Sequence, residues 1–148
     1  MNWNGAELLS VEVIEVEDNA YNGEEWSALD LSGFVNLREL RVGKGCFDNV
    51  DKLTVTGLSE LKSVVIGMNS FTKEKNSYGN DPNRHFYLKN CPKLKSLKMG
   101  RYSFSDYTVI EIENVDALEV IEMGDLNQET RSFYFASLEL KSILIHSE

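Results

Sequence analysis

The sequence repeats a short pattern of apolar residues along nearly its whole length. The clearest copies are LKSVVIGM from Leu61 and LKSLKMGR from Leu94, in which the first, fourth and sixth positions are apolar. The fourth and sixth positions flank a single residue, and this alternation predicts a half-buried strand. Six copies begin at residues 11, 37, 61, 94, 118 and 140, which are separated by 26, 24, 33, 24 and 22 residues. One repeat is therefore about 24 residues long, with an insertion in the third.

Each repeat carries a second alternating apolar pair in its later half. The pair begins eight residues before the next copy in four repeats and seven residues before it in the fifth. These pairs are Leu29 with Leu31, Leu53 with Val55, Phe86 with Leu88, Ile110 with Ile112, and Phe133 with Phe135. We therefore expect two short extended segments in each repeat, neither of which can bury its inner face alone.

Stacking the repeats would bury these faces in one continuous core. The pattern predicts a mainly β solenoid of about six coils with parallel sheets and little helix, forming a single domain over residues 1–148. At roughly 4.8 Å per parallel strand, six coils would make a rod about 29 Å long. Four aromatic residues, Tyr21, Phe47, Phe71 and Phe104, follow the sixth position of their copies by five residues and are expected to stack along the core. The other expected core residues are Leu37, Leu40, Val42, Leu61, Val64, Ile66, Leu94, Leu97, Met99, Leu118, Ile121 and Met123.

A glycine directly follows the first strand in four copies, at Gly43, Gly67, Gly100 and Gly124. Glycine adopts positive φ with little steric cost. We therefore expect these residues to form the corners at which the chain turns out of the sheet.

The repeat resembles that of the leucine-rich repeat superfamily, whose consensus has leucine at positions one, four, six and eleven and Asn at position nine. Leu61, Val64, Ile66, Asn69 and Phe71 occupy these positions, and residues 11–21 fit the consensus as well. The resemblance covers residues 11–145, nearly the whole chain. It implies a right-handed solenoid that serves as a protein-interaction scaffold, without catalysis.

The irregular spacing, and turns that close with the phrase NCPKL at residues 90–94, are similar to those of large protist and bacterial surface leucine-rich repeat proteins. The sequence also departs from the consensus. Gly45, Tyr102 and Leu126 stand where Asn is expected, and the later part of each repeat looks like a second strand instead of a helix.

The outward residues of the first strands form the face through which this superfamily commonly binds partners. The second position reads Glu12, Arg38, Lys62, Lys95, Glu119 and Lys141, and the fifth reads Glu15, Arg41, Val65, Lys98, Glu122 and Leu144. Lys44 and Arg101 lie just past the strand ends. We expect the middle coils to present a basic patch for an acidic protein surface, composed of Arg38, Arg41, Lys62, Lys95, Lys98 and Arg101. The alternative is a set of solubilising charges on a solvated sheet face.

The third repeat exceeds its neighbours by nine residues, and residues 72–85 are rich in the Asn, Gly, Asp and Pro of loops. Insertions in solenoids often lie on a binding side. Candidate contact residues in this loop are Tyr78, Asp81, Arg84 and His85. The alternative is a surface insertion without a role, since closing a longer loop costs little.

The ends of the predicted solenoid suggest a second function. Repeat proteins normally close each end with a polar capping unit, whereas the last predicted strand stops within three residues of Glu148. An uncapped strand edge pairs readily with another chain. We therefore expect Glu12 and Glu15 of the first coil to meet Lys141 and Leu144 of the last in an end-to-end homo-oligomer. The alternative is that the chain is a fragment whose neighbouring coils are missing.

Composition and chemistry narrow the remaining function classes. A formal net charge of -9 argues against general affinity for nucleic acid, and no apolar run approaches the length needed to insert in a membrane. Cys46 and Cys91 make no disulfide framework, and no Asn is followed two positions later by Ser or Thr. These features favour the cytoplasm for the chain as written, and the cell surface if it is a fragment of a longer protein. With His85 and His146 more than two coils apart, we expect no enzyme activity, metal or cofactor.

Overall fold

The computed structural model describes residues 5–73, 81–124 and 137–141. One short helix, α1 (Gly5–Ser10), precedes the first strand. The strands are β1 (Val13–Val16), β2 (Ala28–Asp30), β3 (Glu39–Val42), β4 (Lys52–Thr56), β5 (Ser63–Ile66), β6 (Asp81–Lys89), β7 (Ser96–Met99), β8 (Tyr107–Glu113), β9 (Val120–Met123) and β10 (Ser137–Lys141). The expectation of a mainly β protein with little helix is confirmed.

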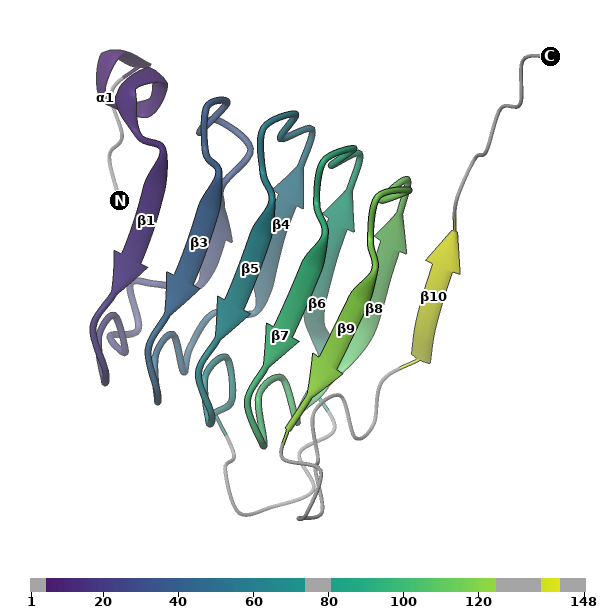
Figure 1. Ribbon diagram of the computed structural model, residues 1–148. Coiled ribbons are helices and arrows are strands. Elements are labelled where there is room, and N and C mark those ends of the chain that lie inside the picture. The colour runs from purple at the N-terminus through teal and green to yellow at the C-terminus, as the bar shows by residue number, and fades with distance from the viewer. Residues whose placement is uncertain (1–4, 74–80, 125–136, 142–148) are drawn as a thin grey trace, which may run out of the picture.

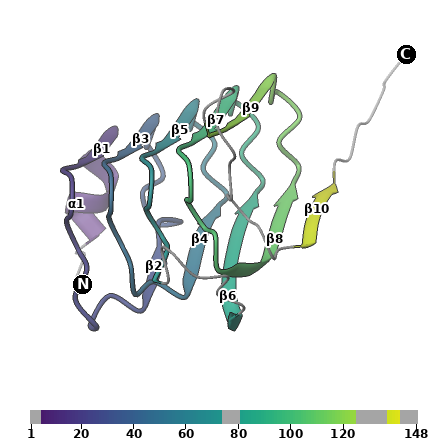
Figure 2. The same cartoon turned by 90° about the horizontal axis from the view of Figure 1, so that it is seen from below.

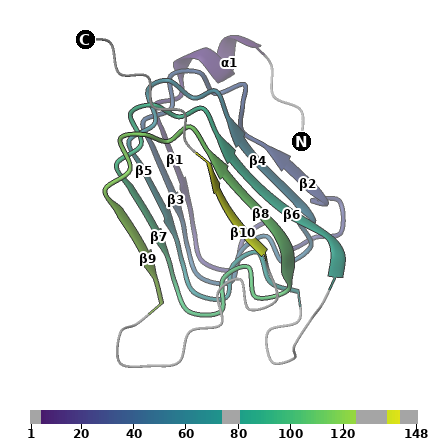
Figure 3. The same cartoon turned by 90° about the vertical axis from the view of Figure 1, so that its right-hand side faces the viewer.

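The strands form two parallel sheets between which the chain alternates. The first sheet has the order β1-β3-β5-β7-β9, and the second has the order β10-β8-β6-β4-β2. Figure 1 shows the strands of both sheets following one another from left to right, and Figure 3 shows the two sheets as facing layers. The prediction of parallel sheets is confirmed.

The strand register matches the alignment of the repeats for the first five copies. In the first sheet the fourth positions lie opposite one another, from Ile14 through Leu40, Val64 and Leu97 to Ile121. In the second sheet Leu29, Leu53, Phe86 and Ile110 are aligned in the same way. Because side chains alternate between faces, this register directs one apolar column after another toward the space between the sheets.

The prediction for the sixth copy is wrong. Leu140 was expected to begin a strand of the first kind, but β10 joins the second sheet, where Leu138 and Leu140 lie opposite Ile110 and Ile112. The predicted pair at residues 133 and 135 lies outside the described residues. Leu138 with Leu140 alternates as well as any other apolar pair, so periodicity alone cannot decide which pair enters the ladder.

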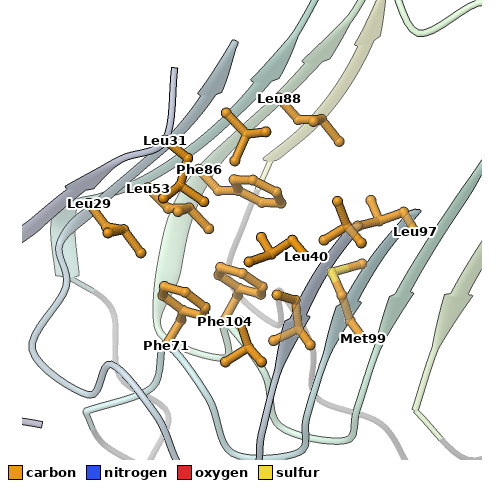
Figure 4. Packing of buried hydrophobic residues seen from close by; sticks show 14 of the residues in the cluster. Leu29, Leu31, Leu40, Leu53, Phe71, Phe86, Leu88, Leu97, Met99 and Phe104 are labelled. Carbon is orange, nitrogen blue, oxygen red and sulfur yellow. The ribbon is translucent and has the colours of Figure 1, made fainter. Parts of the chain in front are cut away.

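The core lies between the two sheets and extends through the middle repeats. Figure 4 shows leucine, phenylalanine and methionine side chains from both sheets meeting there. The expected core residues of the copies beginning at 37, 61 and 94 are all buried. The expectation fails on β9, because Ile121 is 40% exposed and Met123 is 39% exposed. In the described part of the first sheet β9 is an edge strand, so it has a neighbouring strand on one side alone.

The predicted aromatic stack is confirmed. Neighbouring rings of the stack are nearly parallel, with centroid separations of 5.4, 5.0 and 4.8 Å along the series Tyr21, Phe47, Phe71 and Phe104. Each residue has φ between 55° and 59°, a left-handed conformation that costs a non-glycine residue about 1–2 kcal/mol. The burial and stacking of the rings offset that cost.

The glycine corners differ from the prediction. Among the four glycines, Gly124 alone has a positive φ, at 70°. Gly67 is needed for close approach instead, since a Cβ there would lie 2.5 Å from the carbonyl carbon of Gly43. The left-handed corners are two residues further on, where Asn69, for example, has φ of 60° and donates its N–H to Arg101 O (3.0 Å) in the next coil. Asn tolerates this conformation better than most residues.

Candidate functional site

The basic patch predicted from the sequence lies on the outward face of the first sheet. Arg38, Lys62 and Lys95 form one column, tied by backbone hydrogen bonds from Lys62 N to Arg38 O (2.8 Å) and from Lys95 N to Lys62 O (2.9 Å). Arg41 and Lys98 lie in a parallel column on either side of Val65. All five basic side chains are exposed. The strand alternation that buries Leu40, Val64 and Leu97 also aligns these charges on the opposite face.

The charges at the borders of the patch are paired. Arg38 lies 3.7 Å from Glu12, Lys98 lies 3.8 Å from Glu122, and Arg41 is hydrogen-bonded to Glu39 (2.9 Å). Lys62 and Lys95, at the centre, make no ion pair within the part of the chain that the structure describes. Since adjacent strands are about 4.8 Å apart, the two lysines repel each other across the ladder.

The surface between the central lysines is lined by short side chains. Ser63 and Ser96 lie opposite each other, and Val65 lies opposite Lys98. The centre of the patch therefore carries short side chains and one exposed apolar residue, Val65, which lies between Arg41 and Lys98 in the second column. The last predicted patch residue, Arg101, differs from the others because it is half-buried and its guanidinium lies 4.8 Å from the centre of the Tyr102 ring.

The outward face of the second sheet contains an ion-paired lysine and a half-buried tyrosine. Lys89 Nζ lies 2.6 Å from Glu111 and 3.2 Å from Glu113, and these carboxylates raise the pKa of Lys89. The half-buried Tyr87 ring stacks on His85 and lies beneath the ammonium groups of Lys52 and Lys89. Tyr87 thus serves as a cross-strand packing residue on this face.

The expectation that Arg84 belongs to an exposed insertion loop is wrong. Residues 81–89 form β6, and the Arg84 side chain is only 1% exposed. Arg84 points to the same side of the strand as the buried Phe86 and Leu88, because alternate residues share a face. His85 points to the opposite side and stacks on Tyr87. Of the other two loop candidates, Asp81 begins β6 and Tyr78 lies outside the described residues.

Arg84 is the centre of a buried polar cluster that sequence reasoning did not find. Its Nη2 donates to Asp48 O (2.9 Å) and Val50 O (3.0 Å), and its Nε lies 3.5 Å from Asp106 Oδ1. Its guanidinium also lies 4.9 Å from the centre of the Tyr107 ring, and burial raises the pKa of that tyrosine. The order R-x-F-x-L at residues 84–88 was the available signal, since its alternation directs the arginine inward together with the apolar pair.

The expected charge match between the two ends is not present among the described residues. Glu12 and Glu15 belong to the first coil, and Glu15 lies on β1 of the first sheet, whereas Lys141 ends β10 of the second sheet. A continuing stack would place β1 against β9, whose outward residue Glu122 is also acidic. Leu144 lies outside the described residues.

The two thiols are in an unreactive setting. Cys46 and Cys91 are both buried and unpaired with each other, and burial raises the pKa of each thiol above its ordinary value. A raised pKa leaves less thiolate, which is the nucleophilic form. In residues 5–73, 81–124 and 137–141, no three or more His, Cys, Asp or Glu side chains are grouped so as to hold a metal ion.

None of the helical residues that the structure describes forms a segment long and apolar enough to cross a membrane. Comparison with known proteins gives no match, because no family model fits the sequence and no curated protein or solved structure is significantly similar to it.

Proposed function

We propose that the chain is a non-catalytic protein-binding module whose outward face on the first sheet binds an acidic protein surface. The observation that carries this proposal is the column of exposed basic residues at Arg38, Lys62 and Lys95, placed at the middle of a protein with net charge -9. Stacking like charges in a parallel ladder destabilises the fold. Function is a sufficient reason to keep such an arrangement, because an acidic partner would neutralise it.

The repeat pattern supports a leucine-rich-repeat-like solenoid as the scaffold of this module. Five copies in register, two parallel sheets and a continuous core agree with coils that stack one on another. Such an arrangement gives a rigid, extended sheet face. A rigid face lowers the entropy lost on binding, which suits a scaffold for protein partners.

The test is a selection of binding peptides from a random phage-displayed library. The expected result is enrichment of peptides rich in Asp and Glu that bind the wild-type chain and lose binding to the double variant Lys62→Glu/Lys95→Glu. The matched control is Lys52→Glu/Lys73→Glu, which changes the net charge equally at exposed lysines outside the first sheet. Circular dichroism of both variants confirms that they are folded.

Two results would contradict the proposal. One is a selection without acidic enrichment. The other is an equal loss of binding in the control variant, which would mean that net charge and not the first-sheet face controls the interaction.

A further inference from the structure

The N-terminal end of the first sheet is an open strand edge. In Figure 1, β1 is the outermost strand at the left, and among the described strands it pairs with β3 alone. Glu12 O accepts hydrogen bonds from Arg38 N (2.7 Å), just before β3, and from Glu39 N (3.3 Å), at the start of β3. Because backbone groups of successive residues in a strand point to opposite sides, those of Val13 and Glu15 face away from β3. In β3, the backbone groups at the corresponding positions, Glu39 and Arg41, point toward β1. This edge can therefore accept another parallel strand.

An apolar hollow lies beside this edge, between the two sheets. Its volume is about 90 Å³, and its lining includes Ile14, Val16, Tyr21, Leu29 and Leu31. Tyr21 is 46% exposed, so the hollow reaches the molecular surface. Figure 2 shows β1 and β2 at this end on opposite sides of the interior. An added strand would direct alternate side chains toward the hollow, which suits apolar residues.

The charge of the chain is concentrated at the same end. Residues 1–37 contain eight Asp and Glu residues and no Lys or Arg, so they carry -8 of the formal net charge of -9. Glu12 and Glu15 are both exposed on the outward face, and Glu17 and Asp18 follow directly. A partner segment at this edge must therefore be basic on its outward side.

The strand that already pairs with β1 shows which sequence fits beside it. Arg38, just before β3, and Arg41, within it, face outward next to Glu12 and Glu15. Leu40 and Val42 of β3 face the core. We propose that the free edge of β1 binds an extended segment of a partner protein, with basic residues facing Glu12 and Glu15 and apolar residues facing the hollow. The segment would follow the order basic, any residue, apolar, basic, apolar.

Among the strands that the structure describes, none offers a second copy of this chain a suitable segment for the edge. The two segments with the required order, at β3 and β7, are already paired on both sides within the first sheet. At the opposite edge, β9 presents Glu122 on its outward face, which would repel Glu15. The proposal therefore concerns a different partner and a different surface from the basic patch.

The test uses a labelled peptide that copies residues 36–44, NLRELRVGK. Its binding to the full chain is measured by fluorescence anisotropy, and its position by amide chemical shifts. The expected result is saturable binding with shifts concentrated at Val13 and Glu15. A peptide of the same composition, reordered to remove the alternation of basic and apolar residues, is the control. Equal binding of both peptides would overturn the proposal, as would no binding of the first.

Two variants test the backbone and charge contributions separately. Val13→Pro removes an N–H group that points away from β3 toward the free edge, a position where proline is tolerated. This change should weaken peptide binding by at least about tenfold, whereas Val13→Thr should leave peptide binding unchanged. Glu12→Gln/Glu15→Gln should weaken it about tenfold, as expected for two exposed ion pairs. Unchanged affinity of the peptide for Val13→Pro would overturn the proposal. Self-association of the chain that the peptide competitively inhibits would also overturn it, because the edge would then bind a second copy.

Discussion

At the scale of single residues, Arg84 has the strongest structural role among the charged side chains that the structure describes. It is buried at 1% exposure and satisfies the carbonyl oxygens of Asp48 and Val50 while it pairs with Asp106, which is itself only 2% exposed. The two contacts with carbonyl oxygens join segments that are more than thirty residues apart in the sequence. A charged group with this many internal partners cannot be removed without leaving others uncompensated.

Replacing Arg84 with Met should therefore destabilise the protein by about 3–5 kcal/mol, because the buried Asp106 carboxylate loses its counter-charge. Urea unfolding of the wild type and variant measures the difference. Adding Asp106→Asn to Arg84→Met should recover part of the loss, whereas Arg101→Met, at a half-buried arginine outside the cluster, should cost less. A wild-type midpoint for Arg84→Met would contradict the assigned role.

At the scale of elements, the aromatic stack connects successive repeats. Phe71 is fully buried and lies between Phe47 and Phe104, at centroid separations of 5.0 and 4.8 Å. Phe71→Ala should cost about 3–5 kcal/mol in the free energy of unfolding. Phe71→Leu should cost less, because it fills most of the space and loses mainly the ring contacts, each worth about 0.5–1.5 kcal/mol. Thermal and urea unfolding of the two variants provide the comparison, and equal stability of both would contradict a stacked core.

The sequence predicts these elements well where the spacing of apolar residues alone determines the structure. The spacing of Leu61, Val64 and Ile66 specifies a strand and its buried face, so the register of the first five copies followed from the pattern. Arg84 was assigned to a loop because its neighbours have loop composition, although its buried contacts come from segments far away in the sequence. The position of Leu140 was also wrong, since several alternating pairs compete there and only the pairing with Ile112 selects one.

The basic patch and the glycines that follow the first strands were also predicted in part and missed in part. The alignment of Arg38, Lys62 and Lys95 could be predicted, because strand alternation fixes which side chains point outward. The sequence could not predict which of those charges form ion pairs, because ion pairing depends on side-chain geometry across strands. The role of Gly67 could not be predicted either, because the contact that requires a glycine is with the backbone of the preceding repeat.

At the scale of the whole molecule, both edges of the first sheet combine apolar and acidic side chains. Val13 at one edge and Val120, Ile121 and Met123 at the other are exposed large hydrophobic residues, a composition that favours association. Glutamate occupies the second and fifth positions at both edges, with Glu122 on β9 corresponding to Glu15 on β1. Charged residues on edge strands oppose pairing between chains. In the described part of the molecule the acidic edges therefore act against end-to-end assembly.

This arrangement predicts that removing the edge charges promotes self-association. Light scattering behind a sizing column should give the wild type a constant mass near 16.8 kDa over a wide concentration range at low salt. The variant Glu12→Gln/Glu15→Gln/Glu119→Gln/Glu122→Gln should gain mass with concentration, because the exposed apolar edges then meet without repulsion. A variant with the same change of charge at Glu17, Asp18, Glu24 and Glu25, outside the strands, should remain monomeric. A wild-type mass that rises with concentration and falls with added salt would instead mean that opposite charges join the ends, and end-to-end assembly would then replace partner binding as the leading function.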